Sequence, residues 1–209
     1  MTILQVDQLT KKIKGMPIIQ DVSFKLDEGQ IVGLVGANGA GKTTLMKVIL
    51  GLSNYQDGSY KVRANTNNKS NTGALIESPG VYPFLTGYDN LKLLCESKEK
   101  NAIDDIVKKL KMDRYIHKKA KTYSLGMKQK LGIAIAFLNH PQLIVLDEPM
   151  NGLDPKAVRD VRELIVETAK QGTTFLISSH ILSELVKITD SILIIDEGKI
   201  IKQTTREEL

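Results

Sequence analysis

The stretch GANGAGKT, from Gly36 to Thr43, contains the residue types and spacing that most clearly predict chemistry. It has the fixed residues of the phosphate-binding pattern G-x-x-x-x-G-K-[ST] at every position. The glycines let the backbone curl so that N–H groups, at the start of a following helix, point at phosphate oxygens. Lys42 would reach the outer phosphates, and the Thr43 hydroxyl would be an oxygen ligand for Mg²⁺. The residues expected to contact the nucleotide here are Gly36, Asn38, Gly39, Gly41, Lys42, Thr43 and Thr44.

A second candidate for chemistry is LIVLDEP, which spans residues 143–149. Its apolar run predicts a buried strand that ends on Asp147 and delivers a carboxylate to the metal or to a metal-bound water. Glu148 follows one residue later, where it can face the γ-phosphate and act as general base toward an attacking water. An Asp-Glu pair after an apolar run is a weak signal by itself, and the upstream phosphate loop makes it a strong one.

Strand-like and helix-like segments alternate over much of the chain, as the positioning of these residues requires. Strands are predicted over residues 3–6, 21–26, 30–35, 74–77, 143–147, 173–178 and 191–196. Several of these runs are apolar almost throughout, which is typical of strands covered on both faces. Helix-like residues 42–50 and 155–170 follow two of them. The alternation predicts an α/β fold with a central, mostly parallel sheet.

Two other parts of the chain have different patterns. The first ~28 residues resemble antiparallel strands, and SILIIDEGKII has the strand–turn–strand spacing of a hairpin. From about residue 86 to residue 139 the apolar spacing is helical. We therefore expect one domain over residues 1–209, in which a core with its β subdomain (1–77 and 140–209) carries an inserted α-helical subdomain (78–139).

Composition limits the function classes. The 209 residues are 42% hydrophobic and 25% charged, which suits a globular domain. We find neither a run long and apolar enough for a membrane span nor a secretory signal. Cys95 is the single cysteine, so we expect a core residue in a reducing compartment and no intrachain disulfide. The basic residues behind the net charge of +5 are scattered along the sequence, which predicts a solvated surface. Mild attraction to an anionic membrane surface or to nucleotide is the alternative, and nucleic acid is less favoured.

The order of motifs resembles that of the nucleotide-binding subunit of ABC transporters. The phosphate loop is followed by YSLGMKQK (residues 123–130), then by LDEP, NGLDP and SSH, and the resemblance covers essentially the whole chain. SLGMKQ is similar to the signature of the antibiotic-export and lantibiotic-immunity branch, which includes bacitracin-resistance proteins. The resemblance implies a P-loop NTPase core of the ABC type that hydrolyses ATP with Mg²⁺.

The resemblance also implies a site shared by two chains. Cassettes of this family dimerise head to tail, with each ATP between the phosphate loop of one chain and the signature of the other. Carried over, Ser124 and Gly126 would contact the γ-phosphate bound to the partner chain. The family signature has two adjacent glycines, whereas this chain has Leu125 at the first position, and Met127 departs as well. Without the other motifs, Ser124 would be interpreted as an ordinary helix cap.

Three further residues gain roles from the resemblance. A histidine at the place of His180 contacts the γ-phosphate in the family, where its tautomer can donate a hydrogen bond. Asp154, in NGLDP, corresponds to an aspartate at the dimer interface. Ile13, in LTKKIKG, stands where the family usually has an aromatic residue that stacks on adenine. Because Ile13 has no π surface, we expect weak selectivity between ATP and GTP.

Glu77 ends the apolar run in GALIESPGVYPF. Most of the family has a glutamine here that binds Mg²⁺, and the loop after it touches the membrane subunit. The lantibiotic-immunity branch resembles this chain in having the acid, so we expect three metal ligands, Thr43, Glu77 and Asp147. The loop then contains Tyr82, Phe84 and Leu85, which either dock the membrane partner or pack onto their own helices.

These features predict an ATPase subunit that drives a separate integral membrane subunit, peripheral on the cytoplasmic face of the cell membrane. The expected cargo of the complex is an antimicrobial peptide such as a lantibiotic or bacitracin, and no nucleic acid is expected. One alternative is a soluble cassette acting on nucleic acid or ribosomes, although such members have two cassettes or a long coiled coil. Another is a switch that does not hydrolyse, which Glu148 argues against. TTREEL has the spacing of a capping box, so we expect a further C-terminal segment.

Overall fold

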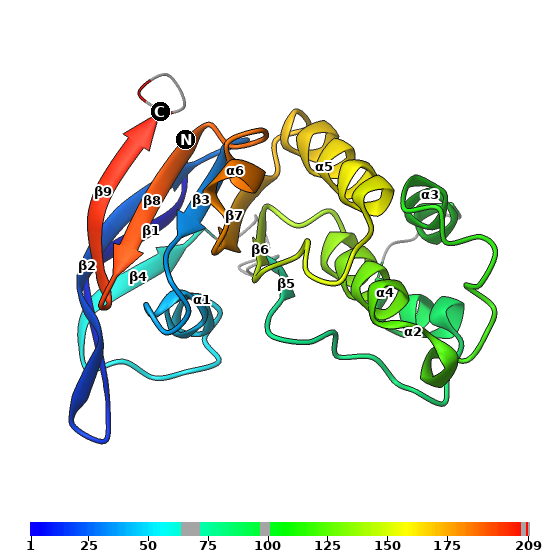
Figure 1. The fold of residues 1–209 in the computed structure, drawn as a ribbon, viewed down its shortest axis with the longest axis horizontal. Helices are drawn as coiled ribbons and strands as arrows, with labels where there is room; N and C mark the ends of the chain where they lie inside the picture. The colour runs from blue at the N-terminus through cyan, green and yellow to red at the C-terminus, as the bar shows by residue number, and fades with distance from the viewer. Residues whose placement is uncertain (64–71, 97–100, 206–207, 209) are drawn as a thin grey trace.

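The computed structural model describes residues 1–63, 72–96, 101–205 and 208 of the chain (Figure 1). The strands are β1 (Thr2–Ile13), β2 (Met16–Asp27), β3 (Ile31–Val35), β4 (Asp57–Val62), β5 (Thr72–Leu75), β6 (Leu143–Leu146), β7 (Thr174–Ser179), β8 (Ser191–Asp196) and β9 (Lys199–Thr205). The helices are α1 (Lys42–Ile49), α2 (Gly87–Leu94), α3 (Ala102–Lys109), α4 (Leu125–Phe137), α5 (Pro155–Ala169) and α6 (Leu182–Leu185), with a 3₁₀ turn over Ala120–Thr122. No helix in these ranges is long and apolar enough to cross a bilayer.

The larger sheet carries the residues predicted to do chemistry. Its strand order is β5-β6-β7-β3-β8-β9, and all neighbours are parallel except β8 and β9. Parallel strands end at a common edge, and in this register Leu75 lies opposite Leu146 and Val35 opposite Ser179. The phosphate loop, Asp147 and His180 come directly after three of these strands. The predicted parallel sheet is confirmed, and it brings these three segments together at the carboxyl ends of its strands.

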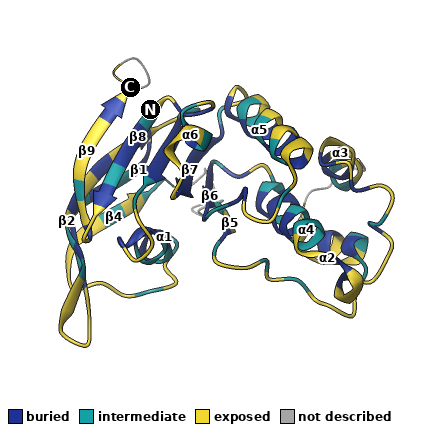
Figure 2. Cartoon of the chain, in the orientation of Figure 1, coloured by how far each residue is buried: buried dark blue, intermediate teal, exposed yellow. Residues whose placement is uncertain are grey.

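Both faces of this sheet are covered, which explains why its strands do not alternate in hydrophobicity. One face packs Leu34, Val145 and Leu176 with residues of α1, β1 and β2. The other face packs Ile144 and Ile177 with residues of α4 and α5. Figure 2 shows the resulting band of buried residues through β6 and β7. A strand buried on both faces has no solvent side to mark with polar residues.

The smaller sheet has the antiparallel order β2-β1-β4, as the N-terminal pattern predicts. β1 and β2 are much longer than expected, and β4 was not predicted at all. The sequence of β4, DGSYKV, has few apolar residues, and most of its side chains are exposed because it is an edge strand. The predicted C-terminal hairpin is confirmed as β8–β9, which turns at Glu197 and Gly198 with φ of 44° and 78°.

The helices α2, α3 and α4 lie within residues 78–139 and form the part of the molecule opposite the smaller sheet (Figure 1). The hydroxyl of Thr86 caps α2 by accepting from Asp89 N–H (3.0 Å). Cys95 follows α2 and is a free, partly buried cysteine packed against the core, not a fully buried one. The helical spacing is confirmed, and the exact domain boundaries stay a prediction.

Candidate functional site

The phosphate loop connects β3 to α1 and depends on glycine at its last turn. Gly41 precedes α1 with φ 108°, a conformation that residues with a Cβ rarely adopt. A Cβ at Gly41 would also lie 2.9 Å from the carbonyl oxygen of Ile18. The first turn of α1 contains no acidic residue, so its N-terminal N–H groups remain suited to an anion.

Lys42 lies inside this loop and is almost completely buried. Its ammonium group donates to the carbonyl oxygens of Gly36 (2.8 Å) and Ala37 (3.1 Å). It also lies 3.7 Å from Oε1 of Glu148. The lysine is therefore held over the loop by groups that a phosphate can replace.

Thr43 and Asp147 bring two oxygens together below the loop. The Thr43 hydroxyl donates to Oδ2 of Asp147 (2.6 Å), and the Ser178 hydroxyl donates to Oδ1 (2.5 Å). The N–H of Asp147 donates to the carbonyl oxygen of Leu75 on the neighbouring strand (2.8 Å). A hydroxyl beside a fixed carboxylate suits Mg²⁺, which prefers oxygen ligands and keeps several positions for water or phosphate.

The two carboxylate oxygens of Glu148 have different partners, His180 for Oε2 and the ammonium of Lys42 for Oε1. Oε2 lies 2.9 Å from Nδ1 of His180. Oε1 is buried and has no hydrogen-bond partner among the described residues. The backbone N–H of Glu148 donates to the Ser178 hydroxyl (2.9 Å), and its φ is 48°, a strained value for glutamate. This arrangement aims an oxygen without a described hydrogen-bond partner at Lys42, with which it forms an ion pair.

These residues line a cleft of about 180 Å³, which contains no residue of the signature segment. The lining residues are Ile18, Asn38, Gly39, Gly41, Lys42, Thr43, Thr44, Asp147 and Glu148. The sequence pattern missed two contributors, Ser178 and Ile18. Ser178 follows an apolar run in a strand, and Ile18 precedes the buried Ile19 on β2, so neither stands out from its neighbours. Ile13 is not a lining residue and is 43% exposed near the end of β1.

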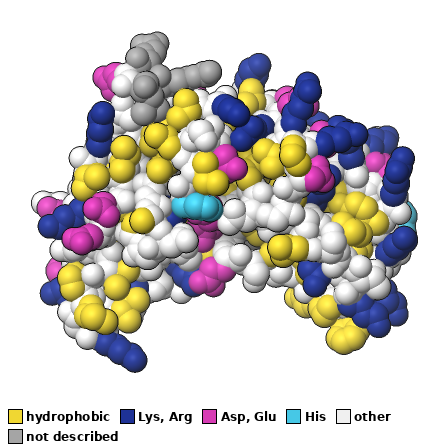
Figure 3. Space-filling model, in the orientation of Figure 1, with side chains coloured by type: hydrophobic (Ala, Val, Ile, Leu, Met, Phe, Trp, Pro, Cys, Tyr) yellow, Lys and Arg dark blue, Asp and Glu magenta, His cyan; other side chains and the backbone are white. Residues whose placement is uncertain are grey.

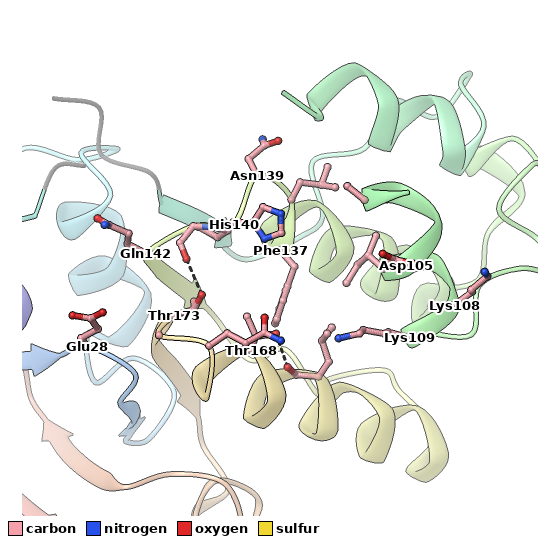
Figure 4. A pocket seen from close by; sticks show the side chains of 17 residues that line it. Glu28, Asp105, Lys108, Lys109, Phe137, Asn139, His140, Gln142, Thr168 and Thr173 are labelled. Atoms are coloured by element: carbon pink, nitrogen blue, oxygen red, sulfur yellow. Dashed lines mark hydrogen bonds between the residues drawn. The ribbon is translucent and has the colours of Figure 1, made fainter. Parts of the chain in front are cut away.

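A larger cavity of about 680 Å³ lies elsewhere, between α3, α5 and the segment that joins α4 to β6 (Figure 4). Apolar side chains such as Phe137 and Leu164 line it together with His140, Lys108 and Glu28. None of its lining residues belongs to the phosphate loop or to the segments directly after the carboxyl ends of the parallel strands. Volume alone therefore does not mark the site, and the convergent polar groups identify the smaller cleft.

The signature segment lies against the NGLDP segment, outside the cleft. Ser124 caps α4 through Met127 N–H (3.3 Å), and a Cβ on Gly126 would lie 2.8 Å from the carbonyl oxygen of Gly152. The side chain of Leu125 covers Gly152 and is itself 67% exposed. The lack of a side chain at Gly152 thus accommodates Leu125.

Asp154 begins α5 and is exposed. Its carboxylate accepts from the N–H groups of Ala157 (2.9 Å) and Lys156 (3.0 Å), and the Ala157 bond is the main cause of a lowered pKa for Asp154. Asp154 lies two residues after Gly152, against which Gly126 packs, and neither Asp154 nor Ser124 nor Gly126 lines the cleft.

Glu77 lies two residues after β5 and has φ 59°. Its Oε1 accepts from the ammonium of Lys47 (2.7 Å). Lys47 is four residues from Thr43 on α1, so the two side chains share a helix face. Glu77 does not line the cleft, and the described ranges contain no group of three or more His, Cys, Asp and Glu placed for a metal. Of the three predicted metal ligands, the structure brings Thr43 and Asp147 together and leaves Glu77 with Lys47.

A family model described as ABC transporter matches residues 19–151. An uncharacterized ABC transporter ATP-binding protein of Bacillus subtilis (strain 168) is 41% identical over 95% of this chain and 68% of its own length. A bacitracin transport ATP-binding protein of Enterococcus faecalis is 37% identical over 99% of this chain and 70% of its own. A lantibiotic transport ATP-binding protein of Streptococcus pyogenes is 38% identical over 95% and 89%.

The fold has matching solved structures. A structure described as the ATP binding subunit of an ABC transporter superposes with a TM-score of 0.89 at 29% identity. The superposition covers 97% of this chain and 90% of that chain.

Proposed function

The chain belongs to the ABC transporter family, as an ATP-binding subunit that hydrolyses ATP, and from this premise we propose which residues do so and which transporter it serves. The observation that carries the proposal is that four side chains converge at the carboxyl ends of the parallel strands. There Lys42, Thr43 and Asp147 meet Glu148, whose Oε1 has no hydrogen bond to a described residue and lies 3.7 Å from the ammonium of the lysine.

Nucleotide binding is assigned to the phosphate loop and Lys42. The N–H groups from Asn38 to Thr44 would surround the β- and γ-phosphates at the start of α1. Lys42 would exchange the carbonyl oxygens of Gly36 and Ala37 for phosphate oxygens, and it would lose its contact with Glu148. The exchange is favourable because a phosphate carries more charge than a carbonyl dipole.

Mg²⁺ would be held by Thr43 and Asp147, which fit it by chemistry and by proximity. When bound, the ion neutralises charge that develops on the phosphates during transfer. Asp147 is fixed for this role because its other oxygen accepts from Ser178. Glu77 would join as a third oxygen ligand only after its carboxylate leaves Lys47, which makes it the adjustable member of the set.

Hydrolysis is assigned to Glu148 as general base. Once Lys42 has turned to the phosphates, Oε1 of Glu148 would accept a proton from the attacking water. His180 holds Oε2 and so fixes the direction of the carboxylate. From the same position, its ring is proposed to reach the γ-phosphate.

A second copy of the chain is proposed to complete the site. The cleft in one chain is about 180 Å³, and it lacks Ser124, Gly126 and Asp154. Ser124 and Leu125 are exposed at the N-terminus of α4, where N–H groups can receive an anion. A head-to-tail dimer would bring that helix end to the ATP of the partner, with Asp154 at the interface.

The membrane partner is proposed to dock on the loop after Glu77. Tyr82, Phe84 and Leu85 are 52%, 75% and 36% exposed, and we call these three side chains the apolar patch. Their exposure favours docking over packing onto their own helices, because an isolated chain leaves this surface in water. The chain would thereby sit on the cytoplasmic face of the membrane.

The cargo is proposed to be an antimicrobial peptide of the lantibiotic or bacitracin type, because relatives at 38% and 37% identity bear those names. The test is disruption of the gene in its own host, followed by growth with bacitracin and with a lantibiotic. We expect sensitivity to one of them, restored by the wild-type chain and not by Glu148→Gln. Unchanged growth with both compounds would contradict the cargo. Copurification of a tagged chain from detergent extracts, without any integral membrane protein, would contradict the transporter role.

A further inference from the structure

The positive charge of the chain is concentrated in its helical part. Residues 78–139 contain twelve Lys and Arg against six Asp and Glu, whereas the rest of the chain contains seventeen against eighteen. The net charge of +5 therefore comes entirely from residues 78–139. Basic residues that look scattered along the sequence are thus unevenly divided between the two parts of the fold.

Three of these lysines lie beside the apolar patch. Residues 116–121 run next to residues 82–87, and the N–H of Lys121 donates to the carbonyl oxygen of Pro83 (2.8 Å). An isolated antiparallel bridge between Thr86 and Lys119 joins the same two segments. The second segment exposes the lysines that we call the lysine rim, namely Lys118, Lys119 and Lys121.

The charges of the lysine rim are not neutralised within the described part of the chain. None of the three forms an ion pair or a side-chain hydrogen bond with a described residue, whereas Lys47 and Lys109 each contact a carboxylate. The nearest acid along the neighbouring segment, Asp89, accepts from the Thr86 hydroxyl (2.6 Å). Backbone hydrogen bonds fix the rim in place while its ammonium groups remain available to an external anion.

The space-filling view agrees with this arrangement. Figure 3 shows hydrophobic side chains beside Lys and Arg side chains at the lower right, over the part of the molecule that contains α2. Lysines without a partner carboxylate among the described residues, next to a surface proposed to dock an integral membrane protein, suit the anionic headgroups at the surface of a bilayer.

We propose that the lysine rim binds the anionic headgroups of a lipid bilayer, next to the place where the apolar patch docks the membrane subunit. The location rests on the proposed function, since docking on an integral membrane protein holds the patch, and so the rim beside it, near the bilayer surface. Each lysine close to an anionic membrane strengthens binding about fivefold, so three lysines supply roughly a hundredfold.

The experiment measures cosedimentation of the full chain with vesicles. One set contains phosphatidylglycerol mixed with phosphatidylcholine, and the other contains phosphatidylcholine alone. The test variant is Lys118→Glu/Lys119→Glu/Lys121→Glu. The matched control is Lys25→Glu/Lys61→Glu/Lys202→Glu, which makes the same change in net charge at exposed lysines of β2, β4 and β9.

We expect the wild-type chain to bind only the anionic vesicles, more weakly as salt rises, with a loss of about a hundredfold in the rim variant. The control should lose only severalfold. Wild-type chain that ignores anionic vesicles would overturn the proposal, as would equal losses in both triple variants. Binding to a short DNA duplex through the rim, without vesicle binding, would also overturn it and indicate nucleic acid.

Two further measurements keep this test separate from the proposed function. ATP affinity by calorimetry should be unchanged in both variants, which shows that they are folded and that the rim is not part of the nucleotide site. If wild-type chain binds vesicles through the rim but no membrane subunit copurifies, the lipid contact stands and the transporter role fails. If a membrane subunit copurifies but the chain does not bind anionic vesicles, the transporter role stands and the lipid contact is wrong.

Discussion

Asp147 and Glu77 are carboxylates that follow neighbouring parallel strands, β6 and β5, yet they have different surroundings. Asp147 is 6% exposed, and both of its oxygens accept hydrogen bonds, from Thr43 and from Ser178. The Glu77 side chain is 62% exposed and accepts from Lys47. The position in the sheet explains the difference, because β6 lies between two strands and β5 is at the edge.

The difference separates a fixed carboxylate from an adjustable one. The partners of Asp147 come from α1 and β7, two elements packed into the core, so its position is set before any ligand arrives. Glu77 is held by one flexible lysine in contact with solvent, and such pairs contribute little to stability. The first arrangement suits chemistry that needs a constant geometry, and the second suits a residue that responds to the metal or to a membrane partner.

The largest expected effect lies at the end of β6. Glu148→Gln should lower the rate of ATP hydrolysis by a factor of about 10²–10⁴. The glutamine amide cannot accept the proton of the attacking water, as Oε1 of Glu148 is proposed to do. Phosphate release measures this, with ATP affinity by calorimetry as the control for folding. The variant should accumulate as a dimer with ATP in size-exclusion chromatography. Near-normal turnover would remove Glu148 from its role.

Lys42→Ala should weaken ATP binding by roughly 10- to 100-fold, the usual range for losing a hydrogen bond to a charged group. The site has no other described lysine or arginine lining the cleft to take its place. Calorimetric titration with ATP measures the effect. Lys47→Ala, one turn further along α1, is the matched control and should bind ATP within severalfold of the wild type. Equal affinity in the Lys42 variant would mean that the loop does not hold the phosphates.

A pair of stability measurements compares the fixed carboxylate after β6 with the adjustable carboxylate after β5. Ser178→Ala should lower the free energy of unfolding by about 1–3 kcal/mol, because Asp147 and the buried N–H of Glu148 would each lose a partner. Lys47→Met should change it by less than about 1 kcal/mol, since the Glu77 pair is largely exposed. Urea denaturation measures both. Similar costs for the two variants would show that the ends of β5 and β6 are equally fixed.

Glu77→Gln should make ATP affinity less dependent on Mg²⁺, by severalfold. Without metal, a carboxylate ~4 Å from the γ-phosphate is repelled by roughly 4 kcal/mol at an effective dielectric of ~20, and solvent and Lys47 reduce this strongly. With metal, an oxygen ligand ~2.1 Å from the ion gains more than it loses. ATP titrations across a range of Mg²⁺ concentrations compare the two chains. Superimposable curves would mean that Glu77 contacts Lys47 and does not bind the metal.

The smallest effect concerns recognition of the nucleotide's adenine or guanine ring. Ile18 lines the cleft, Ile13 lies outside it, and no aromatic residue is among the lining residues. We therefore expect ATP and GTP affinities within about tenfold, or ~1.4 kcal/mol. Competition of each nucleotide against a fluorescent ATP analogue measures the ratio. A strong preference for ATP would mean that an aromatic residue from elsewhere, or from the partner chain, supplies a stacking surface.

The sequence by itself determined which residues form the phosphate-loop pattern and the Asp-Glu pair, and the order of the elements that carry them. GANGAGKT and LIVLDEP are each continuous, so local spacing fixes how the loop curls and where Asp147 and Glu148 emerge. The parallel sheet was predictable for a related reason, because strands buried on both faces are apolar almost throughout. By contrast β4 has too few apolar residues to be recognised, because an edge strand buries little of its surface.

Only the tertiary structure decided which distant side chain contacts each of these residues. Ser178 lies 31 positions from Asp147, and Lys47 lies 30 positions from Glu77, so no spacing rule relates them. The same holds for the lysine rim, which borders the apolar patch because two separate loops hydrogen-bond to each other. Local chemistry is encoded in adjacent residues, whereas the choice between a fixed and an adjustable carboxylate depends on whether its strand is inside the sheet or at its edge.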